Sequence, residues 1–158
     1  MSFFDYPNEP PAPLGAPDYF LPDATDAEWA TLLEHTRHRW FSPGDAVISE
    51  GASDRSLYLI LDGSLEVLVE RGRHRHQRVA SLGAGSVIGE MAFFDGGARS
   101  ALVRAVTAAE LAELSPSEFD ALAAADPALA RRLLFELGRI LAKRLRTSQQ
   151  AASTAGAS

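Results

Sequence analysis

A glycine-led segment near the middle of the chain carries the residue types needed to bind a small anion. Between Val87 and Ala101, Glu90 directly follows Gly89, and Arg99 lies nine residues further on. A guanidinium can engage two oxygens of a phosphodiester with two parallel hydrogen bonds. A carboxylate accepts a hydrogen bond from a sugar hydroxyl, and glycine lets the backbone approach a ligand closely. The segment therefore predicts a site for an anion that also carries a sugar.

The residues between the two charged side chains add backbone donors to this site. Met91 and Ala92 are expected to begin a short helix. The N–H groups at a helix start bind anions without a cost in side-chain entropy. The alternative interpretation of Glu90 and Arg99 is a purely structural ion pair between neighbouring loops.

Short runs of strand-forming residues surround the segment and must position it. Glycines separate these runs, and Asp62-Gly63 is typical of a hairpin turn because both residues tolerate positive φ. Many short strands with glycine turns indicate an antiparallel jelly-roll β-barrel. The expected strands are Ala46–Ser49, Leu57–Leu61, Leu65–Val69, Gln77–Leu82, Ser100–Val106 and Glu110–Leu114.

Helices are expected on both sides of the barrel, so the fold class is α+β. Thr25-Asp26-Ala27-Glu28 fits a capping box that begins a short N-terminal helix. Ser115-Pro116 and Asp126-Pro127 begin two C-terminal helices, the second reaching about Thr147. We expect residues 1–22 to form a disordered or loosely docked, Pro-rich acidic arm, residues 23–147 one ligand-binding domain, and residues 148–158 a flexible tail.

The ordered motifs resemble those of the cyclic-nucleotide-binding domain family. Its phosphate-binding cassette begins with a Phe-Gly-Glu-like start and a short apolar helix, and ends in Arg followed by small residues. Here the cassette reads Ile88-Gly89-Glu90-Met91-Ala92 and then Arg99-Ser100-Ala101. Ile88 replaces the usual Phe, and Ala98 replaces a frequent Pro. The matching upstream motifs are Phe41-Ser42-Pro43-Gly44-Asp45, Glu50-Gly51, Leu57–Gly63 and Leu82–Gly85, so the resemblance covers residues 37–147.

The resemblance implies a cyclic nucleotide as the ligand, with Arg99 on the phosphate and Glu90 on the ribose 2′-hydroxyl. Ser100 could donate its hydroxyl to a phosphate oxygen. Ala at that position is usual in cyclic-AMP sites and Thr in eukaryotic cyclic-GMP sites, so cyclic AMP is favoured only on its frequency in the family, and cyclic GMP is the alternative. The expected contact residues are Gly89, Glu90, Met91, Ala92, Arg99, Ser100 and Ala101, with Val67, Val79 and Ala80 as an apolar wall for the base.

The last predicted helix carries an apolar stripe wide enough for two contacts. Its apolar residues fall within about 160° of a helical wheel, which is more than a helix needs to cover one surface. The stripe could complete one core, or it could also contact the ligand or a second copy of the chain, giving a homodimer through this helix. The resemblance, extended along this helix from Asp126-Pro127, implies that Arg144 and Leu145 lie near the base, so one of them could cap it by cation–π stacking or apolar cover. An ordinary snorkelling role is the alternative for Arg144.

Composition excludes several other classes of protein. The net charge is −6 and there is no cysteine, which argues against general nucleic-acid binding, disulfides and thiolate metal sites. No apolar run suits a membrane span. Residues 1–36 hold seven acids and no Lys or Arg, and residues 127–147 hold six bases against Glu136 alone, as two solvated faces or as mutually attracting ends. We therefore expect a cytoplasmic protein with no membrane partner. We also expect no nucleic-acid partner, because the eleven residues after 147 are too few for a helix-turn-helix.

The resulting hypothesis is a non-catalytic cyclic-nucleotide sensor with no cofactor or metal, which signals to an unidentified protein partner through its C-terminal helices. A ligand-free interaction scaffold of the same fold is the first alternative. A cupin-type metalloenzyme is a weaker one, since His74-Arg75-His76 mimics the His-x-His of metal-binding jelly rolls. No histidine follows His76, and four nearby arginines disfavour a cation, so we interpret residues 71–78 as a basic hairpin loop.

Overall fold

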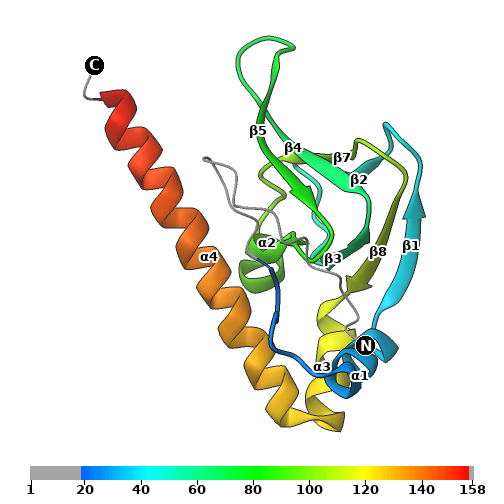
Figure 1. The fold of residues 1–158 in the computed structure, drawn as a ribbon. Coiled ribbons are helices and arrows are strands. Elements are labelled where there is room, and N and C mark those ends of the chain that lie inside the picture. The colour runs from blue at the N-terminus through cyan, green and yellow to red at the C-terminus, as the bar shows by residue number, and fades with distance from the viewer. Residues whose placement is uncertain (1–18, 157–158) are drawn as a thin grey trace.

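Two antiparallel β-sheets form the centre of the molecule in the computed structural model, which describes residues 19–156 (Figure 1). Each sheet has four strands. The first has the order β1 (Arg37–Phe41), β8 (Ala109–Leu114), β3 (Leu57–Asp62), β6 (Val87–Ile88). The second has the order β2 (Ala46–Ile48), β7 (Leu102–Ala105), β4 (Ser64–Glu70), β5 (His76–Gly83).

The jelly-roll architecture is confirmed, but the strands form a sandwich instead of the closed barrel that the sequence predicted. In the described part of the chain, no strand of one sheet pairs with a strand of the other, so each sheet keeps two edges. The six predicted strands are present. The two unpredicted strands had no usable pattern, because β1 is almost entirely exposed and β6 is only two residues long.

Four helices accompany the sandwich within residues 19–156. α1 (Asp26–Glu34) begins with the predicted capping box, in which Thr25 and Glu28 satisfy each other's backbone N–H groups. α2 (Glu90–Asp95) is the short cassette helix, and α3 (Pro116–Ala125) begins at Ser115 as predicted. α4 (Pro127–Gly156) continues beyond Thr147, where its end was expected. No helix within residues 19–156 combines the length and apolar character that crossing a membrane requires.

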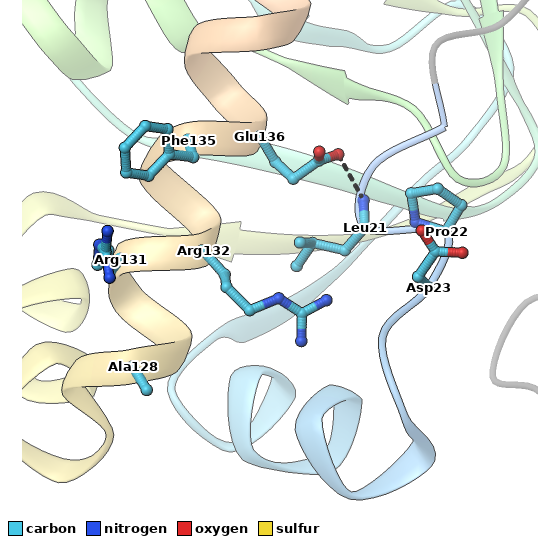
Figure 2. Close-up of a pocket in the computed structure, with 8 residues that line it drawn as sticks. All are labelled: Leu21, Pro22, Asp23, Ala128, Arg131, Arg132, Phe135 and Glu136. Atoms are coloured by element: carbon cyan, nitrogen blue, oxygen red, sulfur yellow. Dashed lines mark hydrogen bonds between the residues drawn. The ribbon is translucent and has the colours of Figure 1, made fainter.

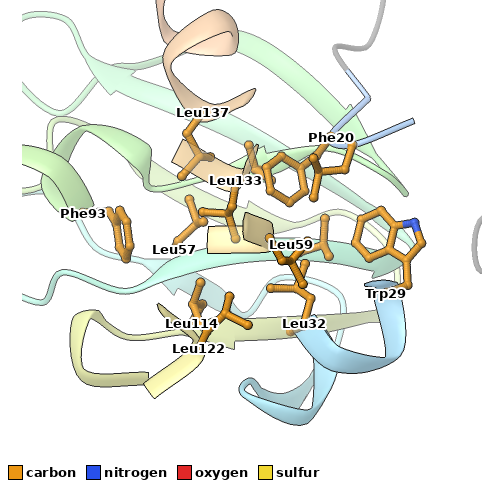
Figure 3. Close-up of a cluster of buried hydrophobic side chains, with 14 of the residues drawn as sticks. Phe20, Trp29, Leu32, Leu57, Leu59, Phe93, Leu114, Leu122, Leu133 and Leu137 are labelled. Carbon is orange, nitrogen blue, oxygen red and sulfur yellow. The ribbon is translucent and has the colours of Figure 1, made fainter. Parts of the chain in front are cut away.

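The hydrophobic core has two parts, one on each face of the first sheet. One cluster lies between the sheets and includes Ile60, Leu65 and Leu111. The other lies between the first sheet and the helices, where Leu133 and Leu137 of α4 are fully buried (Figure 3). Burial of each such leucine contributes about 1.5–3 kcal/mol. The first half of α4 is therefore an integral part of the core.

The predicted N-terminal arm lies mostly outside the described residues, but its last part does not. Phe20 and Leu21 are buried, and the Phe20 N–H donates to the Gly85 carbonyl over 2.8 Å. The Leu21 N–H donates to Glu136 of α4 over 3.3 Å. An ion pair between Glu28 and Arg132 also joins the acidic N-terminal region to the basic last helix. Residues 20 and 21 are thus packed against the domain.

Candidate functional site

Gly89 provides the sharp backbone turn between β6 and α2. It is the N-cap of α2 with φ +85°, a left-handed conformation that favours glycine. A Cβ atom at this position would lie 2.6 Å from Nη1 of Arg99 and 2.8 Å from the carbonyl oxygen of Ser56. The absence of a side chain therefore allows the Arg99 guanidinium to lie directly against the backbone of the turn.

Arg99 is almost completely buried, with 4% of its surface exposed. Its Nη1 donates to the Gly89 carbonyl over 3.0 Å, and its Nη2 donates to the Ser56 carbonyl over 2.6 Å. The carboxylate of Asp54 completes the set, accepting from Nη2 over 2.7 Å and from Nε over 3.3 Å. These four bonds use four of the five guanidinium N–H groups, which holds the group rigidly at the base of the cassette.

Glu90 is the second buried charge, with 7% of its surface exposed. Its Oε1 accepts from Nη1 of Arg144 over 2.8 Å, while Nη2 of Arg144 donates to the Val87 carbonyl over 2.7 Å. The alternative interpretation required an ion pair between Glu90 and Arg99. The two residues instead pair with other side chains. Each is instead neutralised by a residue from a distant part of the chain.

The other predicted cassette residues divide between the buried and exposed surfaces. Ala92 is a buried residue of α2, whereas Met91 and Ser100 are exposed and Ala101 is half-buried. The structure keeps the seven cassette residues in one turn–helix–loop unit.

The predicted apolar wall lies on the β4–β5 hairpin. Val67 and Ala80 are half-buried register partners in the two strands, and a bulge follows Val67. Val79 is 49% exposed. An exposed valine on an edge strand is available to cover an apolar base, and the assignment of these three residues to the base stays a prediction.

Arg144, one of the two predicted lid residues, bonds to the cassette, and its role as a lid stays a prediction. Its guanidinium lies on Glu90 and the Val87 carbonyl, which places α4 against the cassette, and Figure 1 shows α2 between α4 and the sandwich. Leu145, the other predicted lid residue, is 58% exposed. The helix thus reaches the site through an ion pair to the residue predicted to bind the ribose.

Three contributors to the site were not identified from the sequence. Asp54 and Ser56 precede β3 and contact Arg99, and Arg55 between them donates to the carbonyls of Ala92 and Phe93 at the end of α2, over 3.2 Å each. No local motif marks them, because their partners are about forty residues away in sequence.

Tyr58, the second residue of β3, lies near the charges of Asp54 and Arg99. Burial raises the pKa of its phenol, and the nearby Glu113 carboxylate raises this pKa further. Tyr58 therefore stays protonated at neutral pH and adds no negative charge beside Arg99.

A separate groove of about 400 Å³ lies between residues 21–23 and the first half of α4 (Figure 2). None of the predicted ligand-binding residues lines it. The residues lining the groove include Leu21, Pro22, Arg131, Arg132, Phe135 and Glu136.

Among residues 19–156, no group of three or more His, Asp or Glu side chains is arranged to hold a metal ion.

Residues 38–126 match the family described as the cyclic nucleotide-binding domain. The cAMP-activated global transcriptional regulator of Salmonella typhimurium is 33% identical over 118 residues, which are 74% of this chain and 56% of that protein. The chain thus spans little more than half the length of this relative.

Solved structures show the same likeness. The catabolite activator protein of Thermus thermophilus superposes with a TM-score of 0.76 at 26% identity, covering 85% of this chain and 62% of that one. A cyclic nucleotide-binding domain from Methylobacillus flagellatus gives a TM-score of 0.74 at 30% identity, covering 83% and 74%.

Proposed function

Because the chain belongs to the cyclic nucleotide-binding domain family, we propose that it is a non-catalytic sensor that binds cyclic AMP at the cassette and signals through α4 to a protein partner. Its relatives are regulators and sensors. A cytoplasmic location and the absence of a nucleic-acid partner remain predictions from the sequence.

The observation that carries the proposal is the burial of two opposite charges on one glycine-led turn. Burying an arginine and a glutamate is costly unless each has bonding partners, and a structural ion pair between them would be the simplest arrangement. Here Arg99 and Glu90 instead bond to separate partners, Asp54 and Arg144. Two charges that do not neutralise each other suit a ligand that carries both an anionic phosphate and a hydroxyl donor.

Cyclic AMP is the proposed ligand over cyclic GMP. The relative named above is cAMP-activated, which supports this choice. Ser100 is exposed at the cassette, where its hydroxyl is available to either nucleotide. Because Ser100 does not distinguish the two nucleotides, cyclic GMP is the alternative ligand to be measured.

α4 is the proposed output element because it contacts the site directly. Arg144 bonds to Glu90, so a ligand that engages this carboxylate changes the contact that holds the second half of α4. A ligand can shift the position of a helix only by its differential affinity for the two positions. The Glu90–Arg144 pair supplies a physical link through which such a difference can arise.

A homodimer through α4 is the proposed assembly. Phe135 and Leu145 are 69% and 58% exposed, and Gly138 and Ala142 lie between them on the same helix. These four residues follow the three–four spacing of a coiled-coil seam. We name them the α4 seam.

Calorimetric titration with cyclic AMP, cyclic GMP and cyclic di-GMP tests the function. We expect cyclic AMP to bind, and Arg99→Ala to weaken it by at least about tenfold, because charge-assisted bonds contribute about 1.5–3 kcal/mol. Arg78→Ala, which removes an exposed arginine from β5, is the matched control and should bind like the wild type.

Glu90→Gln provides a second test if Arg99→Ala does not fold, and thermal unfolding monitors folding in each variant. Wild-type affinity in both folded site variants would contradict the proposed contacts. Absence of binding to all three nucleotides would instead favour the ligand-free scaffold.

A further inference from the structure

The Arg99–Asp54 pair has the geometry expected for Arg99 and a phosphate. Nε and Nη2 form one edge of the guanidinium, and they donate to Oδ1 and Oδ2 of Asp54 over 3.3 and 2.7 Å. Two parallel bonds from this edge are also what a guanidinium offers to two phosphate oxygens. The carboxylate therefore occupies the edge of Arg99 best suited to a phosphodiester.

The two partners of this pair differ greatly in their freedom to move. The Arg99 side chain is 3% exposed, whereas the Asp54 side chain is 47% exposed. The other acceptors around Arg99 are the backbone carbonyls of Gly89 and Ser56, which cannot leave without moving the turn or the strand. Asp54 is thus the one partner in this set that a side-chain rotation could release.

From this geometry we propose that Asp54 is an internal competitor for the anion-binding edge of Arg99, and that binding of a phosphodiester displaces its carboxylate. This inference rests on the proposed function, because it assumes that Arg99 receives the ligand phosphate. Without a ligand, Asp54 neutralises the buried guanidinium. When a ligand binds, its phosphate takes the place of the Asp54 carboxylate on Arg99. The measured affinity is therefore reduced by the free energy needed to displace Asp54.

The backbone around Asp54 is fixed independently of this pair. The Gly51 N–H donates to the Arg99 carbonyl over 2.8 Å, and the Arg99 N–H donates to the Ala52 carbonyl over 2.9 Å. On the other side, Arg55 is bonded to the end of α2. Removal of the Asp54 charge should therefore leave the loop in place and change only the competition for Arg99.

The test compares Asp54→Asn with Glu50→Gln in a calorimetric titration with cyclic AMP. Glu50 is an exposed acid in the same β2–β3 loop, so the Glu50→Gln control removes an equal charge without touching Arg99. We expect Asp54→Asn to lower the dissociation constant about fivefold to tenfold and Glu50→Gln to change it less than about twofold. An unchanged or weaker affinity in Asp54→Asn, or an equal gain in Glu50→Gln, would overturn the inference.

Inorganic phosphate distinguishes this inference from the proposed function. If Asp54 competes for Arg99, phosphate should raise the melting temperature of Asp54→Asn more than that of the wild type, and Asp54→Asn/Arg99→Ala should lose the difference. That result without nucleotide binding would reject the sensor function and keep the inference. If the wild type binds cyclic AMP, but Asp54→Asn neither binds it more tightly nor gains more melting temperature from phosphate, the sensor function would stand and the inference would be rejected.

Discussion

The position of the Arg99 guanidinium depends on the absence of a side chain at Gly89. The guanidinium lies against Gly89 because a Cβ atom there would approach Nη1 within 2.6 Å. The same glycine has φ +85°, which side-chain-bearing residues rarely adopt. Two independent requirements thus meet at one residue of the cassette.

Gly89→Ala should therefore destabilise the protein and disturb Arg99. We expect the free energy of unfolding to fall by about 2 kcal/mol or more, because the backbone strain and the contact with Arg99 add. Urea denaturation followed by circular dichroism measures this change.

Gly72→Ala is the matched control for that measurement. Gly72 has φ +71°, but nothing lies within 4 Å of a Cβ atom at that position. It should show the strain alone and lose less stability than Gly89→Ala. Equal losses in the two variants would show that contact with Arg99 does not matter.

At the scale of elements, the two halves of α4 are held in different ways. Leu129, Leu133, Leu137 and Ile140 anchor the first half in the core, and no residue from 141 to 150 is fully buried. Beyond Ile140, the contacts of Arg144 with Glu90 and the Val87 carbonyl fix the helix to the cassette. The second half of α4 therefore depends largely on polar contacts.

Arg144→Ala should loosen this second half without unfolding the domain. We expect the amides of residues 141–150 to exchange hydrogen about fivefold to tenfold faster, because bonds to a charged group are lost. Hydrogen-exchange mass spectrometry resolves this segment from the buried half of the helix.

Arg146→Ala is the control, because Arg146 is exposed two residues further along the same helix. Equal hydrogen-exchange rates of residues 141–150 in the Arg144→Ala and Arg146→Ala proteins would show that Arg144 does not hold this part of α4 against the cassette. Titration of Arg144→Ala and Leu145→Ala with cyclic AMP separately tests the predicted lid, which two unchanged affinities would reject.

At the scale of the whole molecule, the α4 seam is an exposed apolar stripe among the residues that the structure describes. Phe135 carries the guanidinium of Arg131 over its ring at 5.5 Å, and Leu145 lies ten residues along the helix. A symmetric dimer would bury the same stripe from both copies. The small residues Gly138 and Ala142 would allow two helices to approach closely between the larger side chains.

Phe135→Asp and Leu145→Asp should each weaken this dimer. We expect the wild type to have twice the 17.0 kDa chain mass by light scattering at micromolar concentration, and each variant to shift toward the monomer mass. Trp40→Asp, at a 70% exposed residue of β1, is the control and should stay dimeric. A monomeric wild type, or dissociation by all three substitutions, would contradict assembly through the seam.

Local patterns in the sequence determined most of the elements and the cassette. Caps, glycine turns and alternating apolar residues act over a few positions, so the strands β2–β5, β7 and β8 and the starts of α1, α3 and α4 follow from short stretches. The same holds for Gly89, Glu90 and Arg99, which lie within eleven residues of one another. β1 was missed because its side chains are exposed, and its existence depends on pairing with β8.

Only the tertiary structure decided which partners neutralise the two charges of the site. Asp54 is 45 residues from Arg99, and Arg144 is 54 residues from Glu90. No periodic pattern links such positions, because their contact depends on how the β2–β3 loop and α4 pack onto the cassette. The division of eight strands into two open sheets has the same origin, since closure of a barrel depends on long-range pairing between edges.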